Sequence, residues 1–432
     1  TANKDALTQN AYLHMGLARG EVEHIQLVFP SKVNEEYRFT FDRYLKGIQI
    51  SARELKKMNG YYDALVPFKN QLKCTDTLTA VWITVQCPSR VPVGKYHQTI
   101  KIEGSKHFTI QLDYNVHHTT IPLKSSIPIT VGVENRCMTE CLNDKEADKE
   151  RQRWVDFVLS YRMTPVFGTQ ITPERWQYEH SFSPWAWNDK RSIRLLNDRR
   201  YSCYMLPFFT LSENELASLL CNIQKKGKLK ESLFYIWDEP AYMEDYEQIK
   251  RKVNIIRKYA SDARILTTFF CGPRNGPRKG DLYAVFDYLK HHIHVATISL
   301  APCKGNEEEV QHIRYKVPEG IDWWSYVCWQ PGGNEPNFLL QMKGIQQRAI
   351  MWRTWKNGSQ GFLYWNCNIY HKRNPFTYIT DMPHGDGILI YPGDILGCKG
   401  PIASARLERW RDGAEEMELL RLVEKNYSKE KA

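Results

Sequence analysis

The spacing of hydrophobic and polar positions changes near residue 125 and divides the chain into two parts. Before this point, short apolar or alternating runs are separated by turn residues. Residues 80–85 form an apolar run, 88–94 supply a turn, and 96–102 and 108–114 alternate in character. Recurring short strands between turns predict an all-β sandwich over residues 1–125.

After a Pro- and Ser-containing linker at residues 122–128, apolar strand-like runs alternate with helical stretches. Ser212 and Glu215 form a capping box, residues 246–256 have apolar positions at helical spacing, and 337–355 form a third predicted helix. The eight predicted strands are residues 127–134, 163–167, 203–209, 233–237, 265–270, 294–300, 323–328 and 361–365.

Eight such units in about 300 residues match the size of a TIM barrel. We therefore expect an α/β chain with a (β/α)8 TIM-like barrel over residues 126–432, preceded by the sandwich. A doubly wound open sheet is the alternative, which usually carries a glycine-rich turn after its first strand. The turn at residues 135–140 (NRCMTE) has none. A last helix at 406–425 has an apolar stripe typical of core packing, and it is assigned to the barrel.

The composition is that of an ordinary globular protein, with 42% hydrophobic and 25% charged residues. The net charge of +10 comes from Lys and Arg spread along the chain among acidic residues, so we expect no nucleic-acid partner. An acidic glycan substrate stays open. The 11 cysteines are scattered and form no disulfide framework. No apolar run reaches the length of a membrane span, and we expect a periplasmic or secreted protein whose signal peptide has been removed.

Asp238 and Glu239 are the strongest candidates for catalysis. They follow the apolar and aromatic run 234–237 of the fourth predicted barrel strand and precede Pro240. Catalytic groups of such barrels lie at the carboxyl ends of the strands. Two carboxyls this close do not ionise together easily, so one keeps its proton to higher pH, as a general acid requires. The alternative is an acidic pair at a helix N-terminus.

The adjacency of the two carboxyls constrains the chemistry. A retaining glycosidase with a protein nucleophile needs carboxyls about 5 Å apart on opposite sides of the scissile bond, and an inverting one needs about 6.5–9.5 Å. Neighbouring residues on one strand suit substrate assistance better, in which the sugar's 2-acetamido oxygen attacks the anomeric carbon. One carboxylate then holds the acetamido N–H, and the other protonates the leaving oxygen.

Several sequence strings resemble glycoside hydrolase family 123, a family whose relatives share a DUF4091-type C-terminal region. They cover both predicted domains: the Pro-X-Gly-X-Tyr turn at 92–96, YIWDEP at 235–240, GFLYWN at 361–366, GDGILIYPG at 385–393 and LERWRDGAEE at 407–416. The resemblance implies a retaining β-N-acetylgalactosaminidase without cofactor. Asp238 would orient the acetamido group, and Glu239 would be the acid/base.

Further side chains are expected to form the pocket wall, because they end barrel strands or lie in the loops that follow. Glycines flank Asp386, so a role in a turn is about as expected for this residue as a role in substrate binding. The candidates for substrate binding are Tyr326, Trp329, Trp365, Asn366, Asp386, Tyr391 and Trp185.

Two other functions stay open: a glycosidase with Asp386 or Glu335 opposite Glu239, and a glycan-binding protein without activity. We expect no metal, because the histidines at 291, 292 and 294 lie before a strand, at the non-catalytic end. The glycine-rich stretch 272–280 lacks the Lys-Ser/Thr of a P-loop, and no Gly-X-Ser-X-Gly elbow occurs. The expected partner is a glycan of a glycolipid or glycoprotein, and the sequence leaves the oligomeric state undetermined.

Overall fold

The computed structural model describes residues 10–41, 47–172, 177–301, 307–375 and 384–428. The chain forms two compact units: Thr1–Leu123 with Gly393–Ala432, and Lys124–Pro392. This division differs from the predicted one, because the C-terminal helix α9 (Ala405–Asn426) groups with the first unit. Within that unit, the buried Arg406 of α9 forms an ion pair with the buried Asp63 at 2.9 Å.

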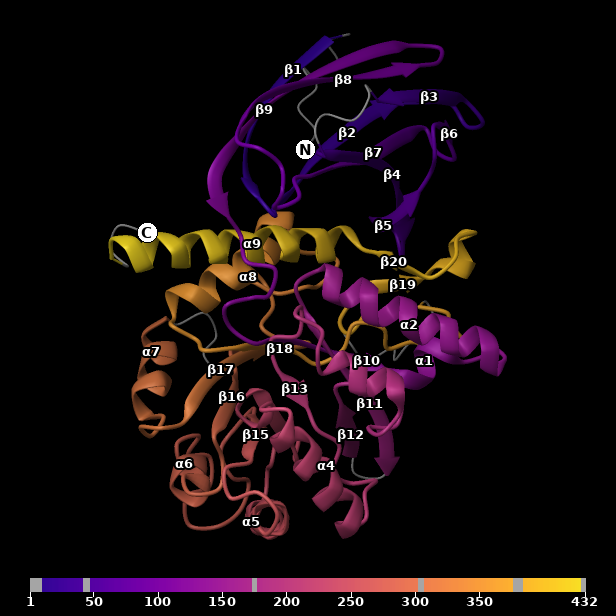
Figure 1. Ribbon diagram of the computed structural model, residues 1–432. Coiled ribbons are helices and arrows are strands. Elements are labelled where there is room, and N and C mark those ends of the chain that lie inside the picture. The colour runs from indigo at the N-terminus through magenta and orange to yellow at the C-terminus, as the bar shows by residue number, and fades with distance from the viewer. Residues whose placement is uncertain (1–9, 42–46, 173–176, 302–306, 376–383, 429–432) are drawn as a thin grey trace. The chain divides into compact units, whose positions relative to one another are not determined.

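The first unit contains two sheets that form a β-sandwich (Figure 1). One sheet has the order β1-β9-β8-β3-β6 and the other the order β2-β7-β4-β5. Their strands are β1 (Asn10–Arg19), β2 (Val22–Pro30), β3 (Glu36–Phe41), β4 (Gln49–Met58), β5 (Tyr61–Pro67), β6 (Gln71–Lys73), β7 (Leu78–Gln86), β8 (Gly94–Glu103) and β9 (His107–Thr120). The short strand β20 (Pro401–Ala403) precedes α9.

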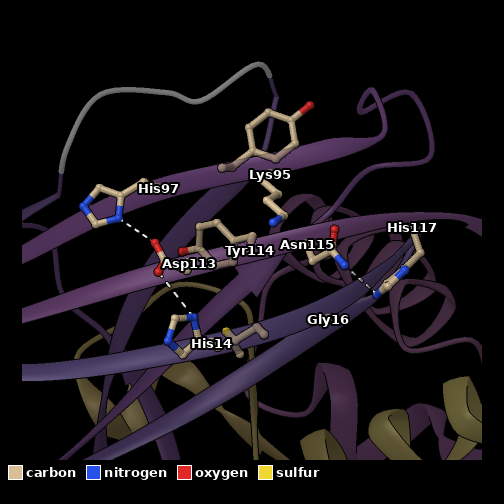
Figure 2. A pocket seen from close by; sticks show the side chains of 10 residues that line it. His14, Gly16, Lys95, His97, Asp113, Tyr114, Asn115 and His117 are labelled. Carbon is tan, nitrogen blue, oxygen red and sulfur yellow. Dashed lines mark hydrogen bonds and ion pairs between the residues drawn. The ribbon is translucent and has the colours of Figure 1, made fainter.

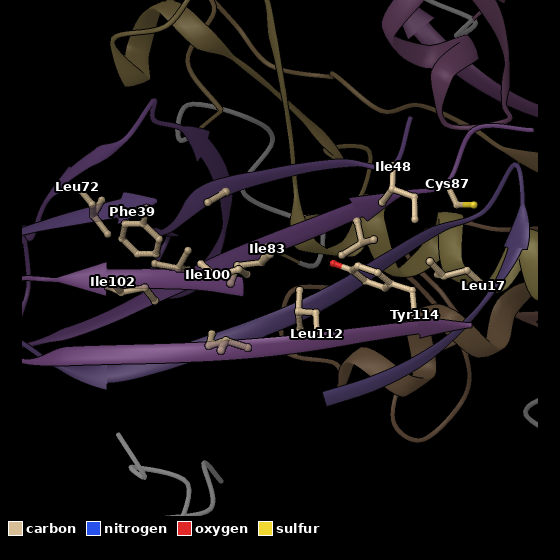
Figure 3. Packing of buried hydrophobic residues seen from close by; sticks show 14 of the residues in the cluster. Leu17, Phe39, Ile48, Leu72, Ile83, Cys87, Ile100, Ile102, Leu112 and Tyr114 are labelled. Carbon is tan, nitrogen blue, oxygen red and sulfur yellow. The ribbon is translucent and has the colours of Figure 1, made fainter. Parts of the chain in front are cut away.

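Side chains of both sheets meet in one hydrophobic core (Figure 3). In β8, Ile100 and Ile102 are buried, whereas Lys95 and His97 are exposed. Side chains of a strand alternate between its two faces, so β8 has one face in the core and one in solvent. Tyr114 of β9 is also buried and donates a hydrogen bond to Gln98 at 3.0 Å. This alternation leaves one polar outer face on the sheet that contains β1, β9 and β8.

The second unit is built on a nine-stranded, barrel-like sheet that is nearly closed. Eight strands are parallel, and the last of them, β18, pairs with the first, β10. The exception is β12, which is antiparallel to β11 and lies at the open edge. The strands are β10 (Ile129–Glu134), β11 (Thr164–Thr172), β12 (Gln177–Ser181), β13 (Tyr204–Met205), β14 (Ser232–Tyr235), β15 (Arg264–Phe269), β16 (Val295–Ser299), β17 (Asp322–Val327) and β18 (Phe362–Tyr364), and the short β19 (Ile390–Pro392) follows.

Helices alternate with these strands along the chain (Figure 1). The helices are α1 (Asn135–Thr139), α2 (Asp144–Ser160), α3 (Lys190–Leu195), α4 (Glu213–Lys225), α5 (Met243–Arg257), α6 (Ala284–Leu289), α7 (Glu307–Lys316) and α8 (Gly344–Lys356). The predicted Ser212–Glu215 capping box is present at the start of α4. The third predicted helix begins at Gly344, later than expected, because Asn337 lies in a loop, where its side chain donates hydrogen bonds to two backbone carbonyls. Among the described residues, no helix is long and apolar enough to span a membrane.

Candidate active site

Asp238 and Glu239 lie just beyond the carboxyl end of β14, which ends at Tyr235. The backbone of Glu239 has φ +42°, in the left-handed region that a residue with a side chain rarely adopts. Such a conformation costs about 1–3 kcal/mol and persists where the surrounding structure enforces it, often at functional sites. At this bend the chain leaves the strand geometry that would point neighbouring side chains to opposite faces. The carboxyls of Asp238 and Glu239 therefore lie in one site, and each has its own hydrogen-bond donors.

The Asp238 carboxylate is held by two neutral hydroxyl groups. Its Oδ1 atom accepts a hydrogen bond from Tyr235 at 2.7 Å and one from Thr268 of β15 at 2.8 Å. Thr268 Oγ1 also accepts from the backbone N–H of Glu239 at 2.9 Å, which fixes the bend between the two carboxyls. Within the described part of the chain, Oδ2 has no hydrogen-bond donor and is available to a ligand.

The Glu239 carboxyl is less exposed than its neighbour and is anchored from another strand. Tyr326 of β17 donates a hydrogen bond to Oε1. Burial and, to a smaller extent, the negative charge of Asp238 raise the pKa of Glu239 to about 7, against the lowering effects of Tyr326 and Arg274. Near neutral pH, Glu239 can therefore donate a proton and take it back, as a general acid/base must.

A pocket of about 200 Å³ opens beside Asp238. His180 of β12 stacks on Tyr235 with ring centroids 4.2 Å apart, and burial lowers the pKa of His180 to about 3, so its imidazole is neutral. The backbone directly after β18 comes very close to Gly132, where a Cβ would lie 1.9 Å from the Trp365 carbonyl oxygen. The lining residues are Thr130, Gly132, Val133, Val166, Gly168, Tyr178, His180, Tyr235, Asp238, Leu363, Tyr364, Trp365 and Asn366.

Trp365 and Asn366 line this pocket, as the sequence predicts of pocket walls. The indole N–H of Trp365 donates to Asp386 at 3.0 Å, and Tyr364 donates to the same oxygen at 3.0 Å. Asp386 is buried behind these rings and is absent from the pocket lining. Its geometry is that of a residue that orients Trp365.

Four other predicted substrate contacts lie outside the pocket lining, and one of them, Tyr326, contacts Glu239 instead. Trp185 is buried, donates its indole N–H to Asp148 at 2.8 Å and is covered by Arg191, so an outer sugar subsite has no support there. Tyr391 is also buried, and its predicted contact is likewise unsupported. Trp329 differs from both, since it is 42% exposed and stacks on Phe270.

The site also contains residues that the sequence does not single out, notably Thr268, His180 and Arg274. Thr268 lies in an apolar strand, where a threonine is an ordinary residue. His180 lies in β12, whose polar sequence QYEHS carries no strand signal that would have placed it at the sheet edge. Among the described residues, no three His, Cys, Asp or Glu side chains gather as metal ligands.

Comparisons with known proteins agree with this architecture. A solved family 123 glycoside hydrolase from Clostridium perfringens, studied for glycolipid glycan hydrolysis, has a similar fold with TM-score 0.67 and 15% identity, over 96% of this chain and 85% of that one. Two other solved enzymes are much more distant. A Bacteroides ovatus GH5 xyloglucanase has TM-score 0.31 and 10% identity, over 94% of this chain and 98% of that one. An Eisenbergiella tayi GH2 β-galacturonidase has TM-score 0.37 and 8% identity, over 92% of this chain and 90% of that one. No curated protein matches.

The family model described as the glycoside hydrolase 123 catalytic domain matches residues 149–423, more than half of the chain. The matched region contains Asp238, Glu239 and the side chains that hold them. The resemblance inferred from the sequence motifs is confirmed by this match. The chain is a glycosidase that belongs to glycoside hydrolase family 123.

Proposed function

We propose that this enzyme removes terminal β-linked N-acetylgalactosamine from glycans with retention, using the sugar's own 2-acetamido group as the nucleophile. The observation that carries the proposal is the pair Asp238–Glu239, two adjacent carboxyls with separate partners and a shared electrostatic coupling. Neighbouring carboxyls cannot easily stand on opposite faces of one scissile bond, as a mechanism with a protein nucleophile requires.

In the first step, the acetamido oxygen bonds to the anomeric carbon while the bond to the leaving oxygen breaks. Glu239 donates its proton to that oxygen, from the Oε2 atom that Tyr326 does not contact. The acetamido nitrogen gains positive charge as the oxazolinium forms. Asp238 Oδ2 accepts the hydrogen bond of this N–H and stabilises the charge, while Oδ1 stays fixed by Tyr235 and Thr268.

In the second step, water attacks the anomeric carbon and opens the oxazolinium ring. Glu239, now ionised, takes the proton of this water and returns to its starting state. Two displacements at one carbon give overall retention. The pocket beside Asp238 holds the sugar ring, with Trp365 as an aromatic wall and His180 beside the acetamido group.

Asp386 and Glu335 are weaker candidates for a separate nucleophile. Asp386 accepts hydrogen bonds from two rings behind the pocket wall, and Glu335 forms an ion pair with Arg353 at 2.8 Å.

We further propose the (β/α)8 type for the barrel, because its eight parallel strands follow chain order and β18 pairs with β10. The glycan is proposed to belong to a glycolipid, by analogy with the Clostridium perfringens enzyme, or to a glycoprotein.

The deciding experiment compares 4-nitrophenyl β-glycosides of N-acetylgalactosamine, N-acetylglucosamine and galactose at equal concentration. We expect hydrolysis of the first and almost none of the galactoside, which lacks the acetamido nucleophile. A thiazoline analogue of the oxazolinium should inhibit strongly, because an active site binds mimics of its transition state best. Comparable rates on the acetamido and hydroxyl substrates would refute substrate assistance.

A further inference from the structure

A second site lies on the outer face of the sandwich sheet, within the first unit. Strand register places His14, Asp113 and His97 side by side on β1, β9 and β8. The neighbouring row, from the same three strands, is Gly16, Asn115 and Lys95. These two rows lie on the solvent side of the sheet and contain no hydrophobic side chain.

The Asp113 carboxylate is occupied on both oxygens by imidazoles (Figure 2). His97 Nδ1 donates to Oδ1 at 2.7 Å, and His14 Nδ1 lies 3.3 Å from Oδ2. The bond from His97 lowers the pKa of Asp113, so this carboxylate stays ionised. Because a carboxylate only accepts hydrogen bonds, His97 uses its Nδ1–H here and keeps its Nε2 atom for another molecule.

A depression of about 580 Å³ is lined by these residues together with His117, Met15, Tyr96 and Tyr114. Gly16 keeps it open, since even a Cβ at this position would lie 3.2 Å from His117 Nε2. The backbone of Gly16 does not require glycine, because it lies within the regular register of β1 with β9. The missing side chain therefore provides space.

The depression contains an ammonium group, that of Lys95, which no carboxylate pairs with in the described part of the chain. No residue in the described part of the chain forms an ion pair or hydrogen bond with the exposed ammonium of Lys95, which lines the depression. The carboxylate of Asp113 already accepts a hydrogen bond from His97 and has His14 Nδ1 beside its other oxygen. Tyr12, two residues before His14 on the same strand face, is 65% exposed and presents a ring face on which a sugar can stack.

We propose that this depression binds an acidic glycan, with a carboxylate or sulfate at Lys95 and sugar hydroxyls at His14, His97 and Asn115. Charge-assisted hydrogen bonds to an anion are stronger than those between neutral groups, and sugar hydroxyls can both donate to and accept from imidazole. This inference goes beyond the hydrolysis itself. Attachment of a glycan here raises the effective concentration of linked chains around the enzyme.

The test is isothermal titration of the full chain with 3′-sialyllactose, galactose 6-sulfate and lactose at low ionic strength. None of these carries a terminal β-linked N-acetylgalactosamine, so their binding is independent of the proposed hydrolysis. We expect at least one acidic ligand to bind about tenfold or more tightly than lactose. Its identity distinguishes a carboxylate ligand from a sulfate ligand.

Two variants locate the binding. Lys95→Ala removes the cation and Gly16→Glu fills the depression with negative charge, and each should weaken acidic binding about tenfold or more. The matched control is Lys69→Ala, an exposed lysine of the same unit outside the depression, which should leave binding unchanged. If Gly16→Glu melts well below wild type, Lys95→Ala decides alone. Equal binding of lactose, absence of acidic binding, or binding that Lys95→Ala does not weaken would overturn the proposal.

Discussion

Each unit of this enzyme contains an aspartate held between two polar side chains, yet the two aspartates differ in their surroundings. Asp238 in the second unit is held by Tyr235 and Thr268, whose hydroxyls are neutral. Asp113 in the first unit is held by His97 and His14, which can carry charge. Asp113 lies on an open sheet face, whereas the partners of Asp238 are buried in the barrel.

This comparison shows that the surroundings, more than the number of hydrogen bonds, decide what a carboxylate does to its neighbours. Neutral hydroxyls orient Asp238 without cancelling its charge, and that charge raises the pKa of the partly buried Glu239. The partners of Asp113 are ionisable, so its charge can be paired. The arrangement around Asp238 raises the pKa of a neighbouring acid, whereas the arrangement around Asp113 forms part of a polar surface.

The largest effect is expected from Glu239→Gln, which removes the acid/base. General acid–base catalysis contributes about 10²–10⁴-fold, so kcat should fall about 1,000-fold on glycosides with poor leaving groups and less on 4-nitrophenyl glycosides. Steady-state kinetics on both substrate classes test this. The control Glu335→Gln, which breaks only the pair with Arg353, should stay within about twofold of wild type. Full activity of Glu239→Gln would remove this residue from the site.

Asp238→Asn should lower kcat about 100-fold, the scale of losing one electrostatic group at a developing charge. Since the Asp238 charge raises the pKa of Glu239, its removal should also lower that pKa below about 7. The alkaline limb of kcat/KM, where the acid loses its proton, then moves to lower pH. Should Asp386→Asn cost more than Asp238→Asn, the nucleophile would have to be sought at Asp386.

Tyr326→Phe should cost about tenfold in kcat and move the pH profile in the opposite direction. The hydrogen bond from Tyr326 lowers the pKa of Glu239, so its loss raises that pKa and shifts the alkaline limb to higher pH. A hydrogen bond to a charged group contributes about 1.5–3 kcal/mol, enough for a tenfold change. Shifts of the same sign in Tyr326→Phe and Asp238→Asn would contradict the electrostatic account of this site.

The smallest effect concerns stability and extends the comparison to Glu21, a buried carboxyl of the sandwich unit. Burial raises the pKa of Glu21 to about 8 from an ordinary 4.5. Because the folded-state pKa lies above the unfolded one, the contribution of Glu21 to stability is fully present below about pH 4.5 and is lost as pH rises to about 8. Glu21→Gln should flatten this decline and raise Tm by about 3 °C or more at pH 8.

The control for this measurement is Glu35→Gln in the same unit. Glu35 accepts hydrogen bonds from Ser105 and from the Lys32 backbone, which lower its pKa. A depressed pKa gives stability above the unfolded value, so its replacement should not raise Tm. An equal gain in both variants would mean that general charge reduction, and not the burial of Glu21, causes the effect.

Much of the fold follows from the sequence, because buried strands need apolar side chains whatever their neighbours are. The eight predicted barrel strands are all present, with ends shifted by a few residues. β12 is missed because its sequence is polar and lacks the apolar alternation of a strand, although it pairs with β11, the strand directly before it. The placement of α9 is also decided by tertiary structure, since the buried Arg406–Asp63 pair joins residues 343 apart.

The same limit applies to the active site. The sequence identifies Asp238 and Glu239, because two carboxyls after a buried strand and before a proline form a local pattern. The bend at Glu239, the hydrogen bonds of Thr268 and Tyr326, and the stacking of His180 depend on contacts between strands 29–87 residues apart. Chemical identity is thus encoded locally, whereas the orientation and proton affinity of these groups arise only when the folded barrel brings their partners together and excludes water.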